Sequence, residues 1–194
     1  MASSKQKKRQ QVLEAARSVL EQHGIRKLTL EDVADKAGLA ISSLYYYFSS
    51  KNELLQAVAE LEMEEVLADI EAAVAAAGGP EQQLAAVGRT LMRHMRRISE
   101  LPGITHRERQ AAYAEVERAA QRFKVRIRLL IQSILERGVE QGLFAIDDPE
   151  LVALMFAAGL RGLSDMILNG EFPADRIEAM EKLMALSLDG MRRR

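Results

Sequence analysis

Hydrophobic residues recur at positions three, four and seven apart in successive stretches of the chain, the spacing of one face of an α-helix. Glycine or proline closes most of these stretches. The pattern predicts helices at about 6–23, 30–37, 41–47, 51–77, 81–99, 105–142, 151–168 and 174–189, and no strands. The segment 105–142 is too long for an ordinary globular helix, so we expect a kink or break near residues 110–114. The sequence therefore predicts an all-α protein of about nine helices.

Helix starts are marked by capping boxes, in which a hydroxyl precedes a carboxylate by three residues. Three such pairs stand at predicted helix starts, Thr29 with Asp32, Ser50 with Glu53 and Thr105 with Glu108. Asp148 followed by Pro149 also predicts an N-cap and the first residue of a helix. Gly24 and Gly38 follow the first two helices and predict their ends.

Two of the predicted helices are short and are separated by a turn that contains Gly38. This is the helix-turn-helix geometry, in which the second helix lies in the major groove of DNA. In that second helix, we expect Leu44, Tyr45 and Phe48 to face a small core. Ser42, Ser43, Tyr46 and Tyr47 are then left for other contacts.

The motifs around this turn form a specific combination over about residues 11–58. They are TLEDVA at 29–34, AGL at 37–39 and LYYYF at 44–48, followed by Ser50 and Lys51. In these motifs the chain resembles the TetR family of bacterial transcriptional regulators. The residues at 40–43 depart from the family's common pattern, which tends to have a polar cap, a basic residue and a small residue there.

This resemblance implies a homodimeric repressor that binds a palindromic operator and is released by a small-molecule inducer. It implies a three-helix DNA-binding domain at 1–49 and a larger helical domain at 50–194 for ligand binding and dimerisation. The alternative from another class is a helical ligand-binding or adaptor protein that uses the helix-turn-helix for protein contact. The basic N-terminal part argues against it, because a protein-contact surface does not require charge that neutralises phosphates.

Composition excludes several classes of protein. The chain has 194 residues, 48% of them hydrophobic, which is enough for a substantial core. It has no cysteine, so disulfides, thiol catalysis and cysteine-based zinc sites are excluded. No apolar run approaches the length of a membrane span and the N-terminus lacks the hydrophobic segment of a signal peptide, so we expect a cytoplasmic protein.

The formal net charge of −1 is unevenly distributed. Residues 1–52 carry nine lysines and arginines against five acids, whereas the remainder is acidic. A basic N-terminal part fits phosphate binding, because each neutralised phosphate releases counterions. For the run from Lys5 to Arg9 alone, a solvated and disordered tip is an equally good interpretation.

The predicted recognition helix carries no charge, since no charged residue lies between Leu39 and Ser50. The arginine or lysine contact to guanine that dominates direct readout is therefore unavailable from it. We expect Ile41 to pack on a thymine methyl, and Ser42 and Ser43 to hydrogen-bond to bases or phosphates. The other candidate DNA contacts are to phosphates, from Tyr46 and Tyr47, which match family tyrosines, and from Lys27, Thr29, Lys51 and the N-terminal lysines.

Small residues interrupt the apolar helix at 151–168. Glycine costs about 1 kcal/mol relative to alanine in a helix, so a compensating close contact is expected. Two helical hairpins meeting about a two-fold axis would supply it, as the last two helices of TetR proteins typically do. Packing against the chain's own helices is the alternative. The candidate dimer-interface residues are Ala158, Gly159, Gly162, Met166, Ile177, Met180 and Met184.

The family resemblance also implies a small-molecule cavity in the C-terminal domain. Methionine adapts to varied ligands and tyrosine adds a polar group, although ordinary core packing is the competing interpretation of each residue. The candidate lining residues are Met63, Leu67, Met92, Met95, Tyr113, Phe123, Ile127, Met155 and Phe156.

Catalytic and metal-binding motifs are missing from the sequence. His23, His94 and His106 are scattered without metal-ligand spacing, and no nucleophile elbow, P-loop or dinucleotide motif occurs. We therefore expect neither an enzyme nor a cofactor. Between Glu53 and Glu71 the chain has seven acids and no base. We interpret them as a solvated face, or as partners of arginines on later helices, in preference to a metal site.

Overall fold

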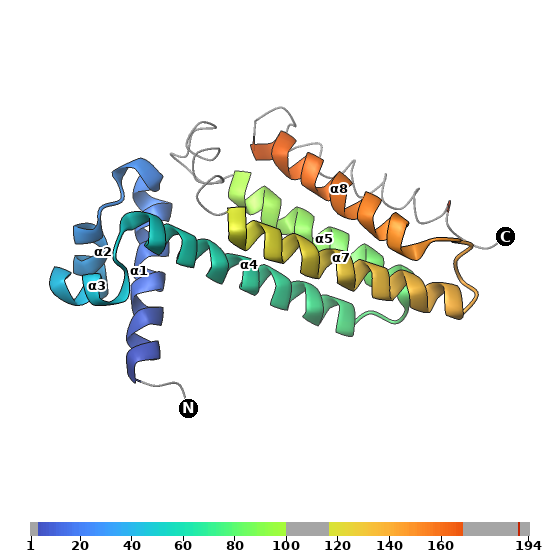
Figure 1. The fold of residues 1–194 in the computed structure, drawn as a ribbon, viewed down its shortest axis with the longest axis horizontal. Helices are drawn as coiled ribbons and strands as arrows, with labels where there is room; N and C mark the ends of the chain where they lie inside the picture. The colour runs from blue at the N-terminus through green and yellow to red at the C-terminus, as the bar shows by residue number, and fades with distance from the viewer. Residues whose placement is uncertain (1–3, 100–116, 169–189, 191–194) are drawn as a thin grey trace. The chain divides into compact units, whose positions relative to one another are not determined.

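The computed structural model describes residues 4–99, 117–168 and 190, which form seven helices and no strand in those ranges (Figure 1). The helices are α1 (Ser4–Lys27), α2 (Leu30–Ala37), α3 (Ile41–Tyr47), α4 (Lys51–Ala75), α5 (Pro80–Ser99), α7 (Glu117–Glu140) and α8 (Pro149–Leu168). The all-α prediction is confirmed. The predicted helix start at Thr105, the break at 110–114 and the helix at 174–189 lie outside the described residues.

The ends of the first three helices follow local signals in the sequence. Gly24 has φ 73° and interrupts α1 where a helix end was predicted. Gly38 has φ 66° and ends α2, with the next amide, from Leu39, donating to the Ala34 carbonyl at 2.9 Å. Helix α1 begins at Ser4, so the run from Lys5 to Arg9 is helical and not a disordered tip.

The capping boxes of α2 and α4 differ in detail. At α2, the Asp32 amide donates to Thr29 Oγ1 at 3.1 Å and the Thr29 amide donates to Asp32 Oδ2 at 3.3 Å, as predicted. At α4, the Glu53 amide donates to Ser50 Oγ at 3.1 Å, but the Glu53 carboxylate accepts from Ser49. The prediction for this second half was wrong by one residue, because Ser49 offers both its amide and its hydroxyl, at 2.7 and 2.6 Å.

The chain divides into two compact units, with the division inside α4. The first unit includes residues 4–63 and packs α1, α2, α3 and the start of α4 around one core. Its largest fully buried side chains are Val12, Leu28, Val33, Leu44, Phe48 and Leu54. Arg17 of α1 pairs with Glu62 of α4 at 2.8 Å. Helix α3 is thus held in place by a core that three other helices share.

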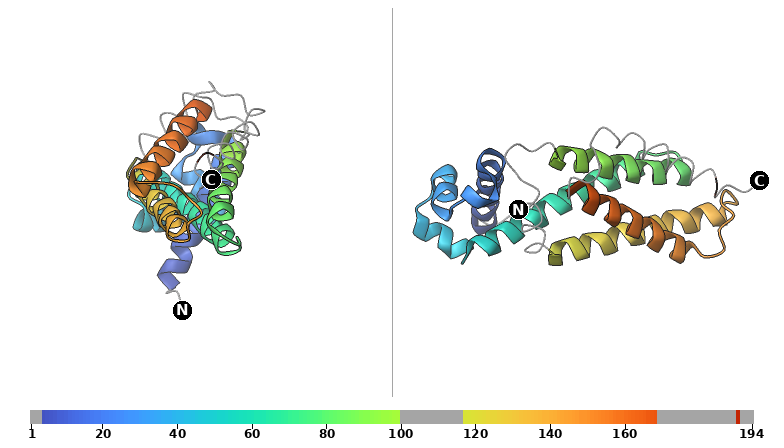
Figure 2. Two further views of the ribbon diagram at one scale, coloured as in Figure 1. Left: turned by 90° about the vertical axis from the view of Figure 1, so that its right-hand side faces the viewer. Right: turned by 90° about the horizontal axis from the view of Figure 1, so that it is seen from above.

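The second unit contains the rest of α4, together with α5, α8 and most of α7. In Figure 2, α7 and α8 form an antiparallel hairpin, and α8 contacts α5. The buried apolar cluster includes Leu67, Ile70, Leu91, Met92, Ile131, Ile134 and Leu135. None of the described helices is long and apolar enough to cross a membrane.

The acids of α4 pair with basic side chains of other helices. Arg126 of α7 donates to Glu64 at 2.8 Å and to Glu71 at 3.2 Å, and His94 of α5 lies 2.9 Å from Asp69. The predicted pairing with later arginines is confirmed for Glu64 and Glu71. Arg126 and the three carboxylates are exposed and only His94 is half-buried, so each pair contributes at most about 1 kcal/mol. No group of three potential metal ligands occurs in the described part of the chain.

The end of α7 is built around Gly138. The buried ring of Phe144 lies directly against this glycine, and a Cβ atom at position 138 would be 2.1 Å from Cδ2 of the ring. The Gly138 carbonyl accepts the amides of Leu143 and Phe144 at 2.9 and 3.2 Å, and Gly142 turns the chain at φ 69°. The connection from α7 to α8 therefore requires a residue without a side chain at 138.

Replacing Gly138 with alanine should lower the free energy of unfolding by about 1–3 kcal/mol, because the new methyl group overpacks the contact with Phe144. The cost of the clash exceeds the gain of about 1 kcal/mol in helix propensity. Urea unfolding followed by circular dichroism measures this change. Gly78→Ala is the control, since a Cβ there meets no atom within 4 Å. Equal stability of the two variants would show that Phe144 moves aside at no cost.

Candidate nucleic-acid interface

Helices α2 and α3 form the predicted helix-turn-helix beside α1 (Figure 1). In α3, Leu44 and the following Phe48 are fully buried, whereas Ser42 and Ser43 are exposed. Ile41 and Tyr47 are half-buried and pack against the core of the first unit. Tyr46 is 68% exposed. The outward face of α3 is thus made of hydroxyl groups and aromatic rings.

Tyr45 belongs to this outward face and not to the core, which corrects the prediction. Its side chain is 51% exposed. Leu44 and Phe48 are one turn apart and define the buried side of α3, and a residue next to Leu44 is rotated by about 100° from it. The pattern of apolar residues could not show that Tyr45 is exposed, because Leu44, Tyr45 and Phe48 are all large and hydrophobic.

Two cationic side chains of α1 lie over aromatic rings at the end of α3. Lys5 Nζ is 4.9 Å from the centroid of the Tyr46 ring, and Arg9 Cζ is 5.0 Å from that of Phe48. Tyr46 in turn meets Tyr47 edge to face, with centroids 5.1 Å apart and planes at 87°. These contacts could not be predicted from local sequence patterns, because they join residues about 40 positions apart.

Three predicted phosphate contacts lie at the ends of α1, α2 and α4, and two of them have structural partners. The Thr29 hydroxyl makes two hydrogen bonds with Asp32. It accepts from the Asp32 amide and donates to the Asp32 carboxylate at 2.7 Å. Lys51 Nζ donates to the Leu28 carbonyl at 2.7 Å. Lys27 is exposed. Gln11, which was not predicted, joins α1 to the end of α2 by donating to the Ala37 carbonyl at 2.7 Å.

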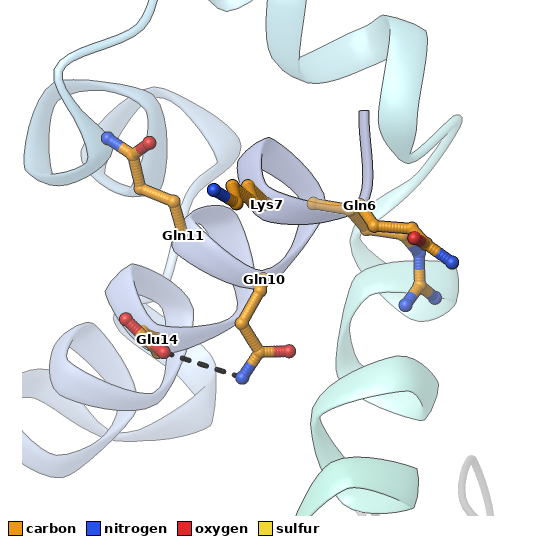
Figure 3. A pocket seen from close by; sticks show the side chains of 6 residues that line it. Gln6, Lys7, Gln10, Gln11 and Glu14 are labelled. Carbon is orange, nitrogen blue, oxygen red and sulfur yellow. Dashed lines mark hydrogen bonds between the residues drawn. The ribbon is translucent and has the colours of Figure 1, made fainter. Parts of the chain in front are cut away.

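A hollow of about 480 Å³ runs along the N-terminal turns of α1. Its lining residues are Gln6, Lys7, Arg9, Gln10, Gln11 and Glu14, all from this one helix. In Figure 3, Gln6 and Gln11 leave α1 in different directions, and Gln10 donates to Glu14 at 3.4 Å. Because the side chains do not converge, this is an open polar surface and not an enclosed ligand site.

Glu53 carries a lowered pKa at the start of α4. The largest cause is the hydrogen bond from the Ser49 hydroxyl, followed by the Ser49 amide and by the positive charge of Arg9, whereas desolvation acts in the opposite direction. The carboxylate is therefore ionised at neutral pH, and it places a negative charge near Arg9.

The residues predicted to line a ligand cavity are only partly brought together. Leu67, Met92 and Ile127 are buried in the core cluster of the second unit, and Met95, Phe123 and Phe156 are half-buried against it. Met63 is half-buried and belongs to the first unit. Met155 is 65% exposed, because the neighbouring Phe156 faces the core. Tyr113 lies outside the described residues.

The predicted dimer-interface residues of α8 lie on an exposed face. Ala158, Gly159, Gly162 and Met166 are all exposed, next to the exposed Leu151, Leu154 and Met155. A Cβ atom added at Gly159 or Gly162 would meet nothing within 4 Å. Ile177, Met180 and Met184 lie outside the described residues.

Two family models match the chain and together cover more than half of it. The model described as bacterial regulatory proteins, tetR family, matches residues 12–58. The model described as tetracyclin repressor-like, C-terminal domain, matches residues 77–165. The chain belongs to the TetR family. The first match contains the whole helix-turn-helix, and this membership in a family of regulatory proteins bears out the prediction that the chain is not an enzyme.

Individual TetR proteins resemble this chain over different lengths. The HTH-type transcriptional regulator YvdT of Bacillus subtilis is 43% identical over 53 residues, 27% of either chain. The HTH-type transcriptional repressor KstR2 of Mycobacterium tuberculosis is 40% identical over 48 residues, 25% of this chain and 24% of KstR2. The chain thus spans about a quarter of the length of these curated relatives.

A solved TetR structure shows the same fold over nearly the full length. The TetR transcription regulator from Haloarcula marismortui superposes with a TM-score of 0.79 and covers 96% of this chain and 99% of its own. Its sequence is 18% identical, so the likeness concerns the fold alone.

Replacing Ser49 with alanine should raise the pKa of Glu53 toward its ordinary value, because the hydroxyl is the main cause of the shift. Folding lowers this pKa, so the ionised carboxylate stabilises the fold above the ordinary carboxyl pKa, and the stabilisation is lost as the pH falls through the lowered value. A carbon-13 NMR titration of the Glu53 carboxyl group measures the pKa. Ser43→Ala is the control, and a Ser49→Ala variant that titrates like the control would contradict the assignment.

Proposed function

We propose that this TetR protein is a homodimeric transcriptional repressor that binds a palindromic operator through α2 and α3 and is released by a small-molecule ligand. Residues 1–49 would bind DNA, and residues 50–194 would bind the ligand and the second protomer. The observation that carries the proposal is the exposed, uncharged face of α3 on a helix-turn-helix whose neighbouring helix α1 begins with four cationic residues.

Binding to DNA would divide into base contacts and phosphate contacts. Ser42 and Ser43 are exposed near the start of α3, where a recognition helix approaches base edges. Half-buried Ile41 would offer part of its side chain to a thymine methyl. Tyr46, Tyr47, Lys27 and the start of α1 would contact phosphates. Thr29 and Lys51 already have hydrogen-bond partners, so they would hold the ends of α2 and α4 in position, and the remaining N–H donors of Lys51 would be left for a phosphate.

The exposed apolar face of α8 supports a dimer. Leu151, Leu154 and Met155 are each at least half exposed, and large exposed apolar patches mark interaction sites. Gly159 and Gly162 would let a helix of the second protomer approach closely. Two recognition helices related by a two-fold axis would read two half-sites of a palindrome.

The proposed sign of regulation rests on the names of relatives, and the proposed ligand class rests on the core of the second unit. Relatives such as KstR2 are named repressors, which favours repression. The core cluster of the second unit is apolar, and Thr90 is the buried polar residue among the described residues. A mainly apolar ligand would therefore fit there. It would release DNA only to the extent that it binds the two states of the protein with different affinity.

Selection of binding sequences from a random library of DNA duplexes tests the function. The purified protein should enrich a palindrome, because two equivalent helices contact it. If the protein binds duplex DNA without enriching any sequence, or does not bind DNA, the repressor proposal fails and the helix-turn-helix is left for contact with another protein.

Two substitutions should separate phosphate contact from base reading. Lys27→Ala should weaken binding to the selected operator and to random DNA alike, and should reduce the salt slope of binding by about one unit per protomer. Ser42→Ala should reduce the preference for the operator and leave the salt slope unchanged. Fluorescence anisotropy at several salt concentrations measures both quantities. If Ser42→Ala and Ile41→Ala both keep the wild-type preference, sequence is read from outside α3.

Gly162→Leu should weaken the dimer. In one chain there is open space around this position, so the leucine would clash only with a partner. Overpacking a close contact costs about 1–3 kcal/mol, which corresponds to an increase of about five- to 150-fold in the dissociation constant. Sedimentation equilibrium measures it, with Ala68→Leu on the exposed side of α4 as the control. A Gly162→Leu dimer as tight as the control would place the interface elsewhere.

A further inference from the structure

The recognition helix lacks charge, yet a cation from another helix lies against it. Lys5 is in the first turns of α1, and its Nζ is 4.9 Å from the centroid of the Tyr46 ring on α3. Both side chains are exposed. A lysine side chain on a surface samples many rotamers, and a contact with a ring face restricts it. The ammonium group of Lys5 is thus kept at the exposed end of α3.

The Tyr46 ring also contacts a second aromatic ring on its side toward the core. It meets Tyr47 edge to face, and Tyr47 is half-buried against the core of the first unit. Tyr47, Tyr46 and Lys5 therefore form a chain of contacts that leads from the core to the surface. A ring fixed in this way can hold a cation at a defined place, which a freely rotating tyrosine could not.

Arg9 occupies the equivalent place one turn further along α1, but its charge is offset. It lies over Phe48, and its charge acts on the Glu53 carboxylate that the Ser49 hydroxyl fixes. Among the described residues neither Lys5 nor Arg9 forms an ion pair, so the difference between them is that the charge of Arg9 acts on the Glu53 carboxylate. Of the two cations positioned at the end of α3, Lys5 is the one whose charge is available to a ligand.

We propose that Lys5 and Tyr46 form one phosphate-contact site, in which the Tyr46 ring positions the Lys5 ammonium for a DNA backbone phosphate beside α3. The inference rests on the proposed DNA-binding function and assigns a positioning role to a ring that would otherwise act through its hydroxyl alone. An ammonium group has three N–H donors, so it can lie over the ring and still donate to a phosphate oxygen. Helix α1 thus supplies the positive charge that α3 lacks.

A double-mutant cycle tests this site in the full-length protein. Lys5→Ala, Tyr46→Leu and the double variant are titrated with the selected operator and with random duplex DNA at several salt concentrations. Lys5→Ala should weaken binding to both DNAs and reduce the salt slope by about one unit per protomer. In the Tyr46→Leu background, the loss caused by Lys5→Ala should be about two- to fivefold smaller per protomer, the range expected of an exposed cation–π contact.

Conservative variants separate the ring from the hydroxyl. Tyr46→Phe keeps the ring, so the coupling with Lys5 should remain even if affinity falls through loss of the hydroxyl. Lys5→Arg should keep both the coupling and the salt slope, because arginine also binds ring faces. Lys8→Ala is the matched control. It removes the same charge from the same turn region of α1, and its effect should be independent of Tyr46.

Three results would overturn the inference. Additive effects of Lys5→Ala and Tyr46→Leu, as expected for Lys8→Ala, would show that the ring does not position the lysine. An unchanged salt slope in Lys5→Ala would show that Lys5 contacts no phosphate. A loss confined to the operator would show that Lys5 reads bases instead. Failure of the proposed function is distinct, because wild-type protein would then bind no DNA or enrich no sequence.

Discussion

Helix α3 has seven residues, and a helix of this length is not stable in water by itself. It forms because Leu44 and Phe48, one turn apart, are both buried in the core shared by α1, α2 and α4. Full burial of such side chains contributes about 1.5–3 kcal/mol each, which offsets the nucleation cost of a short helix. The same two buried side chains determine which side of α3 faces outward, so the geometry of the exposed face of α3 follows from the packing of the core.

Charge in the first unit is kept off α3 and arranged around it. Asp32 and Glu53 lie in the first turns of α2 and α4, where the positive end of the helix dipole stabilises a carboxylate and the caps hold it. Glu53 also offsets Arg9. Lys5 remains available at the outer end of α3. A neutral helix between positioned charges would allow base recognition by hydroxyl and apolar groups while the phosphates are bound from neighbouring elements.

The sequence predicts well what depends on a few neighbouring residues. The bounds of α2 and α3, the cap at Thr29 and the glycine at 38 follow from interactions within a turn, and each was correct. The errors concern which of two adjacent residues makes a contact. Tyr45 is exposed although it was expected in the core, and the Glu53 carboxylate accepts from Ser49 and not from Ser50.

Which individual residues meet across distant positions could not be predicted, although the run of acids on α4 did indicate contacts with arginines of later helices. Lys51 was identified from its place at the head of α4, but its bond to the Leu28 carbonyl spans 23 positions. The rings under Lys5 and Arg9 belong to a different helix. Residue types and helical spacing thus predicted the candidate interface, whereas the contacts that its cations make within the protein became visible only in the structure.

Dimerisation would double the number of phosphate contacts that each of these cations makes per complex with DNA. In a two-fold complex every phosphate contact occurs twice, so removing one lysine from the sequence removes two contacts from the complex, and the salt slope changes by about 1.8 units per dimer. A monomer bound to one half-site would show about half of that change. The salt dependence of DNA binding by a Lys5 variant therefore depends on two things: whether Lys5 of α1 contacts a phosphate, and whether α8 holds two protomers together. If the exposed apolar face of α8 is what joins two protomers, Lys5→Ala combined with a monomeric variant should show the smaller slope change.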